Sequence, residues 1–401
     1  MKPFQHTMRA RCARWGAAVI ISGGLFSACG DDEPTPGPSE EIPLTCEELG
    51  DVDRYEALGD LAVGSSALTL HYGEGISRDL HVWYPAAEPG PQASFIDFIR
   101  PDERARFEAE ASETPAACLV EETAASLDLT PATGTRPLLV FSHCLGCVGP
   151  SMAKVFSTLA SHGFVVAAVT HDDTSWYAED GSDVAHLNTT ELASRSADLI
   201  AALDVLTATP GTQATLQGEL ADAVLAQIDA ERVGLFGHSF GSITSANVVT
   251  LEEGSDRVHA WVGIAAPPGT LTGPKVSDFH LPSMMVIAEE DNSITAVGNY
   301  LMEQNWERIP GPKFLLSFAD MGHFNFTHLT GLGGNFVEGC GEGLRQTNGQ
   351  PFTYMPPEKA MEDLSSALVA FFDHALRGSA EGSGYLRCVA PASVRAKEAR
   401  P

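Results

Sequence analysis

One serine lies in a spacing that is typical of a catalytic nucleophile. The stretch GHSFG at 237–241 fits the pattern Gly-x-Ser-x-Gly, with Ser239 at its centre. A predicted strand precedes it at 232–239, and a predicted helix follows at 241–252. The two glycines allow strand and helix to approach at a sharp turn, and the hydroxyl then lies beside a helix N-terminus, which favours negative charge. We therefore predict that Ser239 is a nucleophile.

A nucleophilic serine needs a base, and the base needs an acid that orients it. Both are expected downstream at strand ends, in the order serine, acid, histidine. His323 follows a predicted strand and is our candidate for the base, with His328 as the alternative. Asp291 follows the preceding predicted strand and is our candidate for the acid, with Glu290 as the alternative. Asp320 is nearer to the histidine in sequence, but we expect it to cap a turn.

A pair of cysteines, Cys144 and Cys147, has the CxxC spacing of a thiol–disulfide redox pair or of half a zinc site. Zinc is disfavoured because the chain has no second CxxC and no HxxxH beside the first. An exported chain meets an oxidising compartment, which favours bridged cysteines over redox-active ones. Outside the predicted export signal and the residue that follows it, six cysteines remain and their pairing is open: Cys46, Cys118, Cys144, Cys147, Cys340 and Cys388.

The N-terminus has the anatomy of an export signal. Residues 1–28 carry basic residues, then an uncharged apolar run, then small residues, which predicts a secretory signal peptide. The apolar run is too short to span a bilayer. LFSAC at 25–29 resembles the lipobox of bacterial lipoproteins, which implies lipidation of Cys29. Residues 29–57 are acidic and proline-rich, which predicts a tether. We expect a bacterial lipoprotein that is anchored to a membrane, either periplasmic or at the cell surface.

The charge balance excludes two classes of partner. The net charge is −29, and removal of the four basic residues within 1–28 would take it to −33. A chain this acidic is not expected to bind nucleic acid or anionic lipid surfaces.

The elements that must position these residues alternate along the chain, which predicts an α/β fold. A hairpin is expected at 66–75 and 77–85, followed by an insertion at 86–136. Alternation of strands and helices implies a mostly parallel sheet with helices on both faces and functional residues beyond the carboxyl ends of its strands. We expect one domain over 58–390 and a tail at 391–401. Further strands are predicted at 137–143, 163–171, 258–266, 281–290 and 313–319, and further helices at 151–162, 191–208, 216–229, 294–307 and 358–376.

Several stretches together resemble the α/β-hydrolase superfamily, and within it the platelet-activating-factor acetylhydrolase-like esterases. The stretches are HVWYP, FSHCLG, GFVVAAVTHDDTS, GHSFG and RSADLIAALDVL with its Arg195 and Asp198. The likeness covers about 58–376, and it implies an α/β-hydrolase fold with loop insertions. It also implies that the catalytic residues are Ser239, Asp291 and His323, and that the backbone N–H groups of Leu145 and Phe240 form an oxyanion hole.

The chain departs from this family at Cys144 and Cys147, where glycine is usual. A bridge between them, or bridges to Cys118 or Cys340, could hold the loop in shape. Three aromatic side chains are expected to line an acyl pocket unless they are ordinary packing residues: Trp176, Phe324 and Phe326. Loop segments at 172–190, 266–280 and 324–356 could cover that pocket. We expect no cofactor and no metal site.

The function that follows is a secreted serine esterase acting on short-chain or phospholipid-type acyl esters. Its expected partners are a small-molecule or lipid ester substrate and, through the lipid anchor, a membrane. A lipase or polyester hydrolase of the same fold is an alternative. A non-catalytic surface-binding lipoprotein and a CxxC thiol protein are alternatives of other classes. The ordered serine, acid and histidine favour the esterase.

Overall fold

The computed structural model describes residues 53–178, 187–271, 275–333, 336, 339–388 and 394–399. One compact unit extends over Ile42–Pro401. The predicted signal peptide, Cys29, Cys46 and nearly all of the tether lie outside the described residues, so these predictions stay untested. Within the described ranges, no helix combines the length and the apolar character that crossing a bilayer requires.

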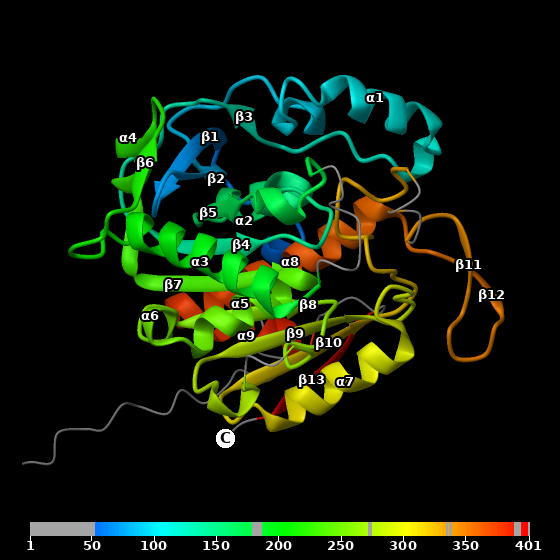
Figure 1. Ribbon diagram of the computed structural model, residues 1–401. Helices are drawn as coiled ribbons and strands as arrows, with labels where there is room; N and C mark the ends of the chain where they lie inside the picture. The colour runs from blue at the N-terminus through cyan, green and yellow to red at the C-terminus, as the bar shows by residue number, and fades with distance from the viewer. Residues whose placement is uncertain are drawn as a thin grey trace, which may run out of the picture. The chain divides into compact units, whose positions relative to one another are not determined.

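A central sheet of eleven strands, counted over the described residues, forms the body of the protein. Its order is β13-β10-β9-β8-β7-β4-β5-β2-β1-β3, with β6 also paired to β1, and the strands follow this order from bottom to top in Figure 1. The six strands from β10 to β5 run parallel to one another. The bounds are β1 Val63–Tyr72, β2 Ile76–Pro85, β3 Ser126–Leu127, β4 Arg136–Ser142, β5 Val165–Val169, β6 Thr215–Gln217, β7 Ile228–His238, β8 Ala260–Ile264, β9 Ser283–Ala288, β10 Lys313–Phe318 and β13 Val394–Ala399.

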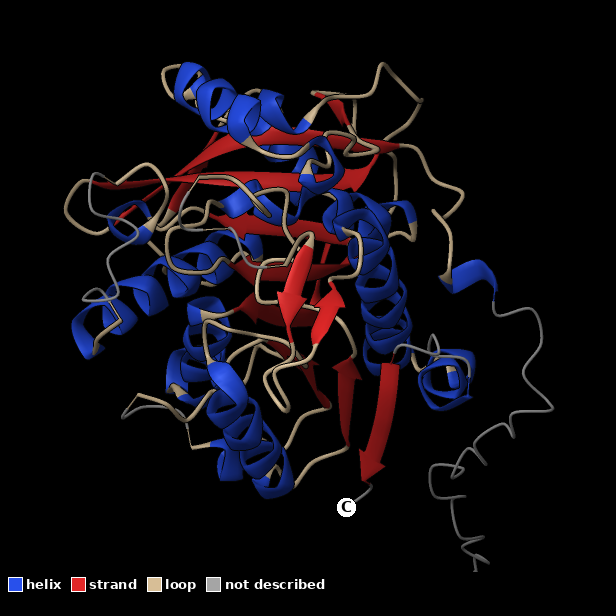
Figure 2. Cartoon of the chain, turned by 90° about the vertical axis from the view of Figure 1, so that its right-hand side faces the viewer, coloured by secondary structure: helices blue, strands red, loops and turns tan. Residues whose placement is uncertain are grey.

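Helices cover both faces of this sheet, as the predicted fold requires (Figure 2). Side chains alternate along β4, so that Leu139 and Phe141 join one apolar cluster with α2 and α8, while Leu138 and Val140 join another with α3, α5 and α7. The helices are α1 Arg104–Glu113, α2 Ala153–Ser161, α3 Thr189–Leu206, α4 Ala221–Leu225, α5 Phe240–Thr250, α6 Glu252–Ser255, α7 Thr295–Arg308, α8 Pro357–Arg377 and α9 Ala380–Cys388.

The predicted hairpin is present as β1 and β2, but the helix predicted at 216–229 is wrong. That stretch contains β6, the short helix α4 and the start of β7. Gly218 has a φ of 147°, which ends β6 and separates it from α4. The alanines and leucines here suit a helix, but pairing of β6 with β1 and of β7 with β4 overrides that preference.

Two predicted boundaries are also wrong, because the folded body extends further in both directions. The predicted tail at 391–401 contains β13, which pairs antiparallel with β10. The predicted tether at 29–57 includes Tyr55, whose side chain is buried and whose hydroxyl donates a hydrogen bond of 2.8 Å to Asp373.

The segment predicted as an insertion, 86–136, lies at the β1 end of the sheet, where Figure 1 shows α1 at the top. A disulfide joins its Cys118 to Cys340, which belongs to the loop-rich segment 324–356. That segment carries a separate antiparallel hairpin, β11 Glu342–Leu344 with β12 Pro351–Thr353. The disulfide therefore ties together two segments that are far apart in sequence.

Candidate active site

Ser239 lies on the sharp turn that the sequence predicted, between β7 and α5. Its φ of 55° and ψ of −122° are unusual for a residue other than glycine and indicate backbone strain. The Ser239 N–H donates to the carbonyl of Ile264 at 2.8 Å, which fixes the turn against β8. A Cβ atom at Gly237 would overlap the backbone of Gly241, and one at Gly241 would overlap the carbonyl of Ser142. Both glycines are therefore needed for the close approach of β7, α5 and β4.

The two other predicted catalytic residues are in direct contact. His323 Nδ1 and Asp291 Oδ2 are 2.6 Å apart, and both side chains are buried. The other oxygen of Asp291 accepts hydrogen bonds of 2.9 Å from the N–H groups of Ser293 and Ile294. Because an aspartate oxygen accepts the Nδ1 proton, the Nε2 atom of a neutral His323 keeps a free lone pair and can take up a proton.

Glu290, the alternative acid, is engaged elsewhere. Its two oxygens accept hydrogen bonds of 2.9 Å from the guanidinium of Arg345 and from the backbone N–H of Gln346. Arg345 also pairs with Asp320. The side-chain amide of Gln346 donates to the backbone carbonyl of Asp291. The hairpin of β11 and β12 thus holds the loop that carries Asp291 and occupies its acidic neighbours.

His328, the alternative base, lies apart from this group. Its Nδ1 donates to the carbonyl of Val120 at 2.6 Å, its Nε2 accepts from the N–H of Lys154 at 3.0 Å, and its ring stacks on Phe95 at 4.4 Å. Burial lowers the pKa of His328 to about 4. A ring with both nitrogens engaged and no charge at neutral pH connects loops and is not available as a base.

His238 joins the loop of His323 to the turn of Ser239. Its Nε2 lies 2.8 Å from the carbonyl of His323, and the two rings are 4.9 Å apart. A carbonyl only accepts, so Nε2 carries the proton and Nδ1 does not. That Nδ1 is buried and has no hydrogen-bond partner among the described residues. Burial lowers the pKa of His238 well below its usual value.

The predicted oxyanion loop follows β4 and is closed by a disulfide between Cys144 and Cys147. Gly146 has a φ of 72°, and its N–H donates to the carbonyl of Thr174 at 2.9 Å. Over the residues that the structure describes, no backbone acceptor takes the N–H of Leu145. Phe240 is the first residue of α5, so its N–H has no partner within the helix. Both predicted oxyanion donors are thus available.

The same disulfide explains a cluster of possible metal ligands. A ligand atom from each of Cys144, Cys147 and His238 lies within 4.8 Å of the others, and all three residues are buried. Metals bind cysteine as the thiolate, whereas these two sulfurs are bonded to each other. The donor set therefore does not suit a metal ion in the disulfide form.

The three predicted pocket residues lie near the candidate site, but all are buried. Phe324 meets the ring of His323 edge-on at 4.8 Å. Phe326 is fully buried and packs against His238 at 5.9 Å. The Trp176 ring is covered by the guanidinium of Arg106 at 3.9 Å, and the backbone N–H of Trp176 donates to the carbonyl of Cys147 at 2.9 Å. These contacts support the two histidines and the oxyanion loop, and contact with a substrate stays a prediction.

Sequence reasoning assigned no role to Arg195, which the structure buries behind the oxyanion loop. Its Nη2 donates to the carbonyl of His143, at the start of that loop. The signal was present in the sequence, because Arg195 lies three residues after Leu192 and four before Leu199, on the apolar face of the predicted helix.

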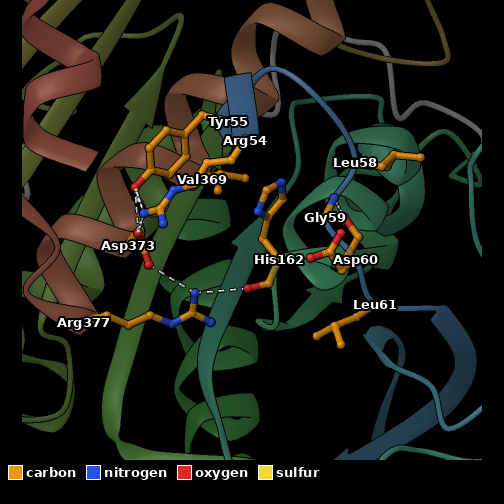
Figure 3. Close-up of a pocket in the computed structure, with 11 residues that line it drawn as sticks. Arg54, Tyr55, Leu58, Gly59, Asp60, Leu61, His162, Val369, Asp373 and Arg377 are labelled. Atoms are coloured by element: carbon orange, nitrogen blue, oxygen red, sulfur yellow. Dashed lines mark hydrogen bonds and ion pairs between the residues drawn. The ribbon is translucent and has the colours of Figure 1, made fainter. Parts of the chain in front are cut away.

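A cavity of about 400 Å³ lies at the opposite end of the sheet, next to the amino end of β5 (Figure 3). Three of its charged lining residues are paired, since Asp373 lies 3.2 Å from Arg377 and 3.1 Å from Arg54. None of the predicted catalytic residues lines this cavity. The cavity is therefore separate from the candidate active site.

Comparison with known proteins agrees with this architecture. The family model of platelet-activating factor acetylhydrolase, isoform II, matches residues 116–191. Platelet-activating factor acetylhydrolase from Bos taurus is 30% identical over 140 residues, which are 28% of this chain and 32% of that protein. The chain thus matches only about a third of the length of this relative.

A solved structure extends the likeness over most of the chain. Ferulic acid esterase from Streptomyces cinnamoneus superposes with a TM-score of 0.58 at 21% identity, covering 80% of this chain and 91% of that one. At this identity the match shows the fold. The protein is thus an α/β-hydrolase in fold, and its predicted resemblance to the platelet-activating-factor acetylhydrolase-like esterases is confirmed.

Proposed function

We propose that the protein is a serine hydrolase that cleaves carboxylic esters through an acyl-enzyme. The observation that carries this proposal is the buried pair of Asp291 and His323, 2.6 Å apart, whose loop is hydrogen-bonded to the residue next to Ser239. The strained turn at Ser239 and the similarity to acetylhydrolases support it.

In the proposed reaction, Ser239 Oγ attacks the ester carbonyl while His323 Nε2 takes the hydroxyl proton. The N–H groups of Leu145 and Phe240 bind the negative oxygen of the tetrahedral intermediate. Collapse of the intermediate breaks the ester bond, and His323 gives its proton to the leaving alcohol. A water then loses a proton to His323 and attacks the acyl group. Collapse of this second intermediate breaks the bond between the acyl carbon and Ser239 Oγ, and His323 returns the proton to that oxygen as the acid leaves. Asp291 orients the imidazole throughout.

The substrate class that we propose is a short-chain or phospholipid-type acyl ester. Similarity to the acetylhydrolases over 116–191 supports it, because this stretch contains both the oxyanion loop and the turn after β5. We also propose export through residues 1–28 and lipidation at Cys29. Transfer of the protein from the membrane fraction to the soluble fraction by Cys29→Ser would support the anchor, and an unchanged distribution would contradict it.

A panel of p-nitrophenyl esters with C2, C4, C8 and C12 acyl chains tests the activity, with methyl ferulate as an aromatic comparison. We expect turnover that is highest for the short chains, and a loss of about 10⁴-fold or more in Ser239→Ala. Ser245→Ala, on the same helix but away from the turn, is the matched control. Absence of turnover for every ester by folded protein would contradict the proposal, and unchanged turnover in Ser239→Ala would contradict the site.

A further inference from the structure

Arg195 is a fully buried cation whose hydrogen-bond partners are all neutral. Its side chain is 1% exposed. Nη1 donates to Thr174 Oγ1 at 2.7 Å and Nε to Thr244 Oγ1 at 3.2 Å. Nη2 donates to Ser142 Oγ at 3.3 Å and to the carbonyl of His143. The guanidinium thus joins β4, the turn after β5 and α5 to its own helix α3.

No carboxylate in the described part of the chain forms an ion pair with Arg195. The nearest acid along α3, Asp198, is occupied by Arg78 at 2.9 Å and by His171 at 2.7 Å. Burial lowers the pKa of Arg195 to about 9, so the side chain remains protonated at neutral pH. Asp198 and Glu191 attract the guanidinium without bonding to it, and a buried charge without a directly paired counter-charge is destabilising. We therefore expect the charge of Arg195 to have a function that offsets this loss of stability.

The charge lies directly behind both segments of the proposed oxyanion hole. His143, whose carbonyl accepts from Arg195, is two residues before Leu145. The guanidinium also lies 4.6 Å from the ring centre of Phe240, the residue that provides the other N–H. Thr174 completes the connection, because its hydroxyl binds Arg195 while its carbonyl accepts the N–H of Gly146.

A buried chain of hydrogen bonds fixes the orientation of Ser142 toward Arg195. His171 Nδ1 lies 2.7 Å from Asp198, and His171 Nε2 lies 2.9 Å from Ser142 Oγ. A neutral His171 that donates its Nδ1–H to Asp198 accepts at Nε2 a hydrogen bond from the Ser142 hydroxyl, so the Ser142 oxygen is free to accept from Arg195. Ser142 is fully buried, so this Asp–His–Ser chain serves to position groups and does not present a nucleophile.

We propose that Arg195 is a positioning residue that holds the oxyanion loop and, through its unpaired buried charge, favours the negative oxygen formed at the N–H groups of Leu145 and Phe240. The inference rests on the proposed function. A fixed positive charge in a dry, low-dielectric surrounding stabilises developing negative charge without reorganisation. Because that charge exists in the transition state but not in the bound ester, the effect falls on kcat and not on KM.

The test compares Arg195→Met with Arg377→Met in the full chain. Arg377 is a matched control because it also stacks on a phenylalanine, Phe164 at 3.9 Å, and donates to the loop carbonyls of His162 and Gly163. Unlike Arg195, it is paired with a carboxylate and lies at the amino end of the strands (Figure 3). The measurements are kcat and KM for p-nitrophenyl acetate, the affinity for an alkylboronic acid, which forms a tetrahedral anion on the serine, and the melting temperature.

For Arg195→Met we expect kcat to fall about 10- to 100-fold, with KM within about 3-fold. The expected loss of kcat is no larger than the loss caused by removing a direct oxyanion donor. Boronic acid affinity should fall in parallel. Arg195→Lys, which keeps the charge but not the planar fork, should recover part of both losses. Arg377→Met should lower the melting temperature and leave kcat within about 2-fold.

Arg195→Met with normal kcat and boronic acid affinity would overturn the proposal, even if the variant is less stable. Should the methionine variant not fold, the pair Arg195→Lys and Arg195→Gln decides, since the first keeps a charge and the second only a donor. About tenfold higher kcat for lysine than for glutamine supports the role of charge, and equal values contradict it. Ser239→Ala separates this inference from the function: if that variant stays active, the proposed mechanism fails whatever Arg195 does.

Discussion

The two ends of the central sheet use arginine in opposite ways. At the amino end, Arg377 faces a cavity and its charge is balanced by Asp373. At the carboxyl end, Arg195 is sealed from solvent and its charge is not balanced by any direct partner among the described residues. Both stack on a phenylalanine and both hold backbone carbonyls. A paired arginine is thus sufficient for packing at the amino end, whereas under the proposed function the unpaired one lies beside the place where negative charge would form.

The largest expected effect comes from replacing one aspartate at each end of the sheet, which tests whether only the carboxyl end takes part in catalysis. Asp291→Asn at the carboxyl end should reduce kcat about 10⁴-fold, because an asparagine no longer holds the imidazole of His323 in the required tautomer. Asp373→Asn at the amino end should leave kcat unchanged and lower the stability. Steady-state kinetics with p-nitrophenyl acetate and thermal unfolding measure both.

Glu290→Gln is the local control for this experiment, since Glu290 is bound by Arg345 and Gln346. We expect less than a tenfold loss of kcat in that variant. A loss in Glu290→Gln as large as that in Asp291→Asn would mean that the acid is not assigned to a single residue, and the reverse order would move the acid to Glu290.

Two disulfides between described residues differ in the length of the loop that each one closes, Cys118–Cys340 a long loop and Cys144–Cys147 a short one. Cys118 and Cys340 are separated by 222 residues, so replacing both with alanine should lower the free energy of unfolding by about 3–5 kcal/mol. Cys144 and Cys147 are only three positions apart, and their double alanine variant should lose about 2 kcal/mol or less.

The two double alanine variants should rank in the opposite order when kcat is measured in place of stability. We expect kcat to fall about tenfold in the Cys144/Cys147 variant, because the loop that provides the Leu145 N–H loses its constraint. The Cys118/Cys340 variant should keep kcat within about 3-fold while it remains folded. Denaturant unfolding and initial rates test both. If the short-loop variant keeps full activity, these cysteines have no part in shaping the oxyanion hole.

The smallest effect concerns acid stability. His328 has its pKa lowered to about 4 by burial, whereas an unfolded histidine takes up a proton near pH 6.5. Between these values the unfolded chain binds the proton and the folded chain does not, so stability is lost as the pH falls, at about 1.4 kcal/mol per pH unit for this residue.

Replacement of this ring by glutamine, which can both donate and accept, should remove that share of the slope. Denaturant unfolding of the wild type and of His328→Gln at pH 7, 6 and 5 measures the change. Equal slopes for the two proteins would show that His328 is not held neutral. Kinetic constants should stay the same, since the ring lies apart from the candidate triad.

The features that could be predicted are those with a local steric cause. The turn at Ser239 requires glycines at 237 and 241, and that requirement is visible in five consecutive residues. The order of acid and histidine follows from strand ends in the same way. The choice between Asp291 and Glu290 could not be made from the sequence, because it depends on Arg345, 54 residues beyond Asp291. The burial of Arg195 could be read from the apolar face of its helix, but its role could not, since its partners come from separate elements.

The strand β13 has a practical consequence for anyone who shortens this chain. Its sequence, VRAKEA, is charged and has no apolar period, so residues 391–401 look dispensable. Their backbone nevertheless pairs with β10 from Lys313 to Phe318. Removal after residue 390 would leave β10 as an uncovered edge with open hydrogen-bonding groups, which is a template for association with another chain. Aggregation of a shortened protein would therefore be a consequence of the missing β13, and not of an unstable fold.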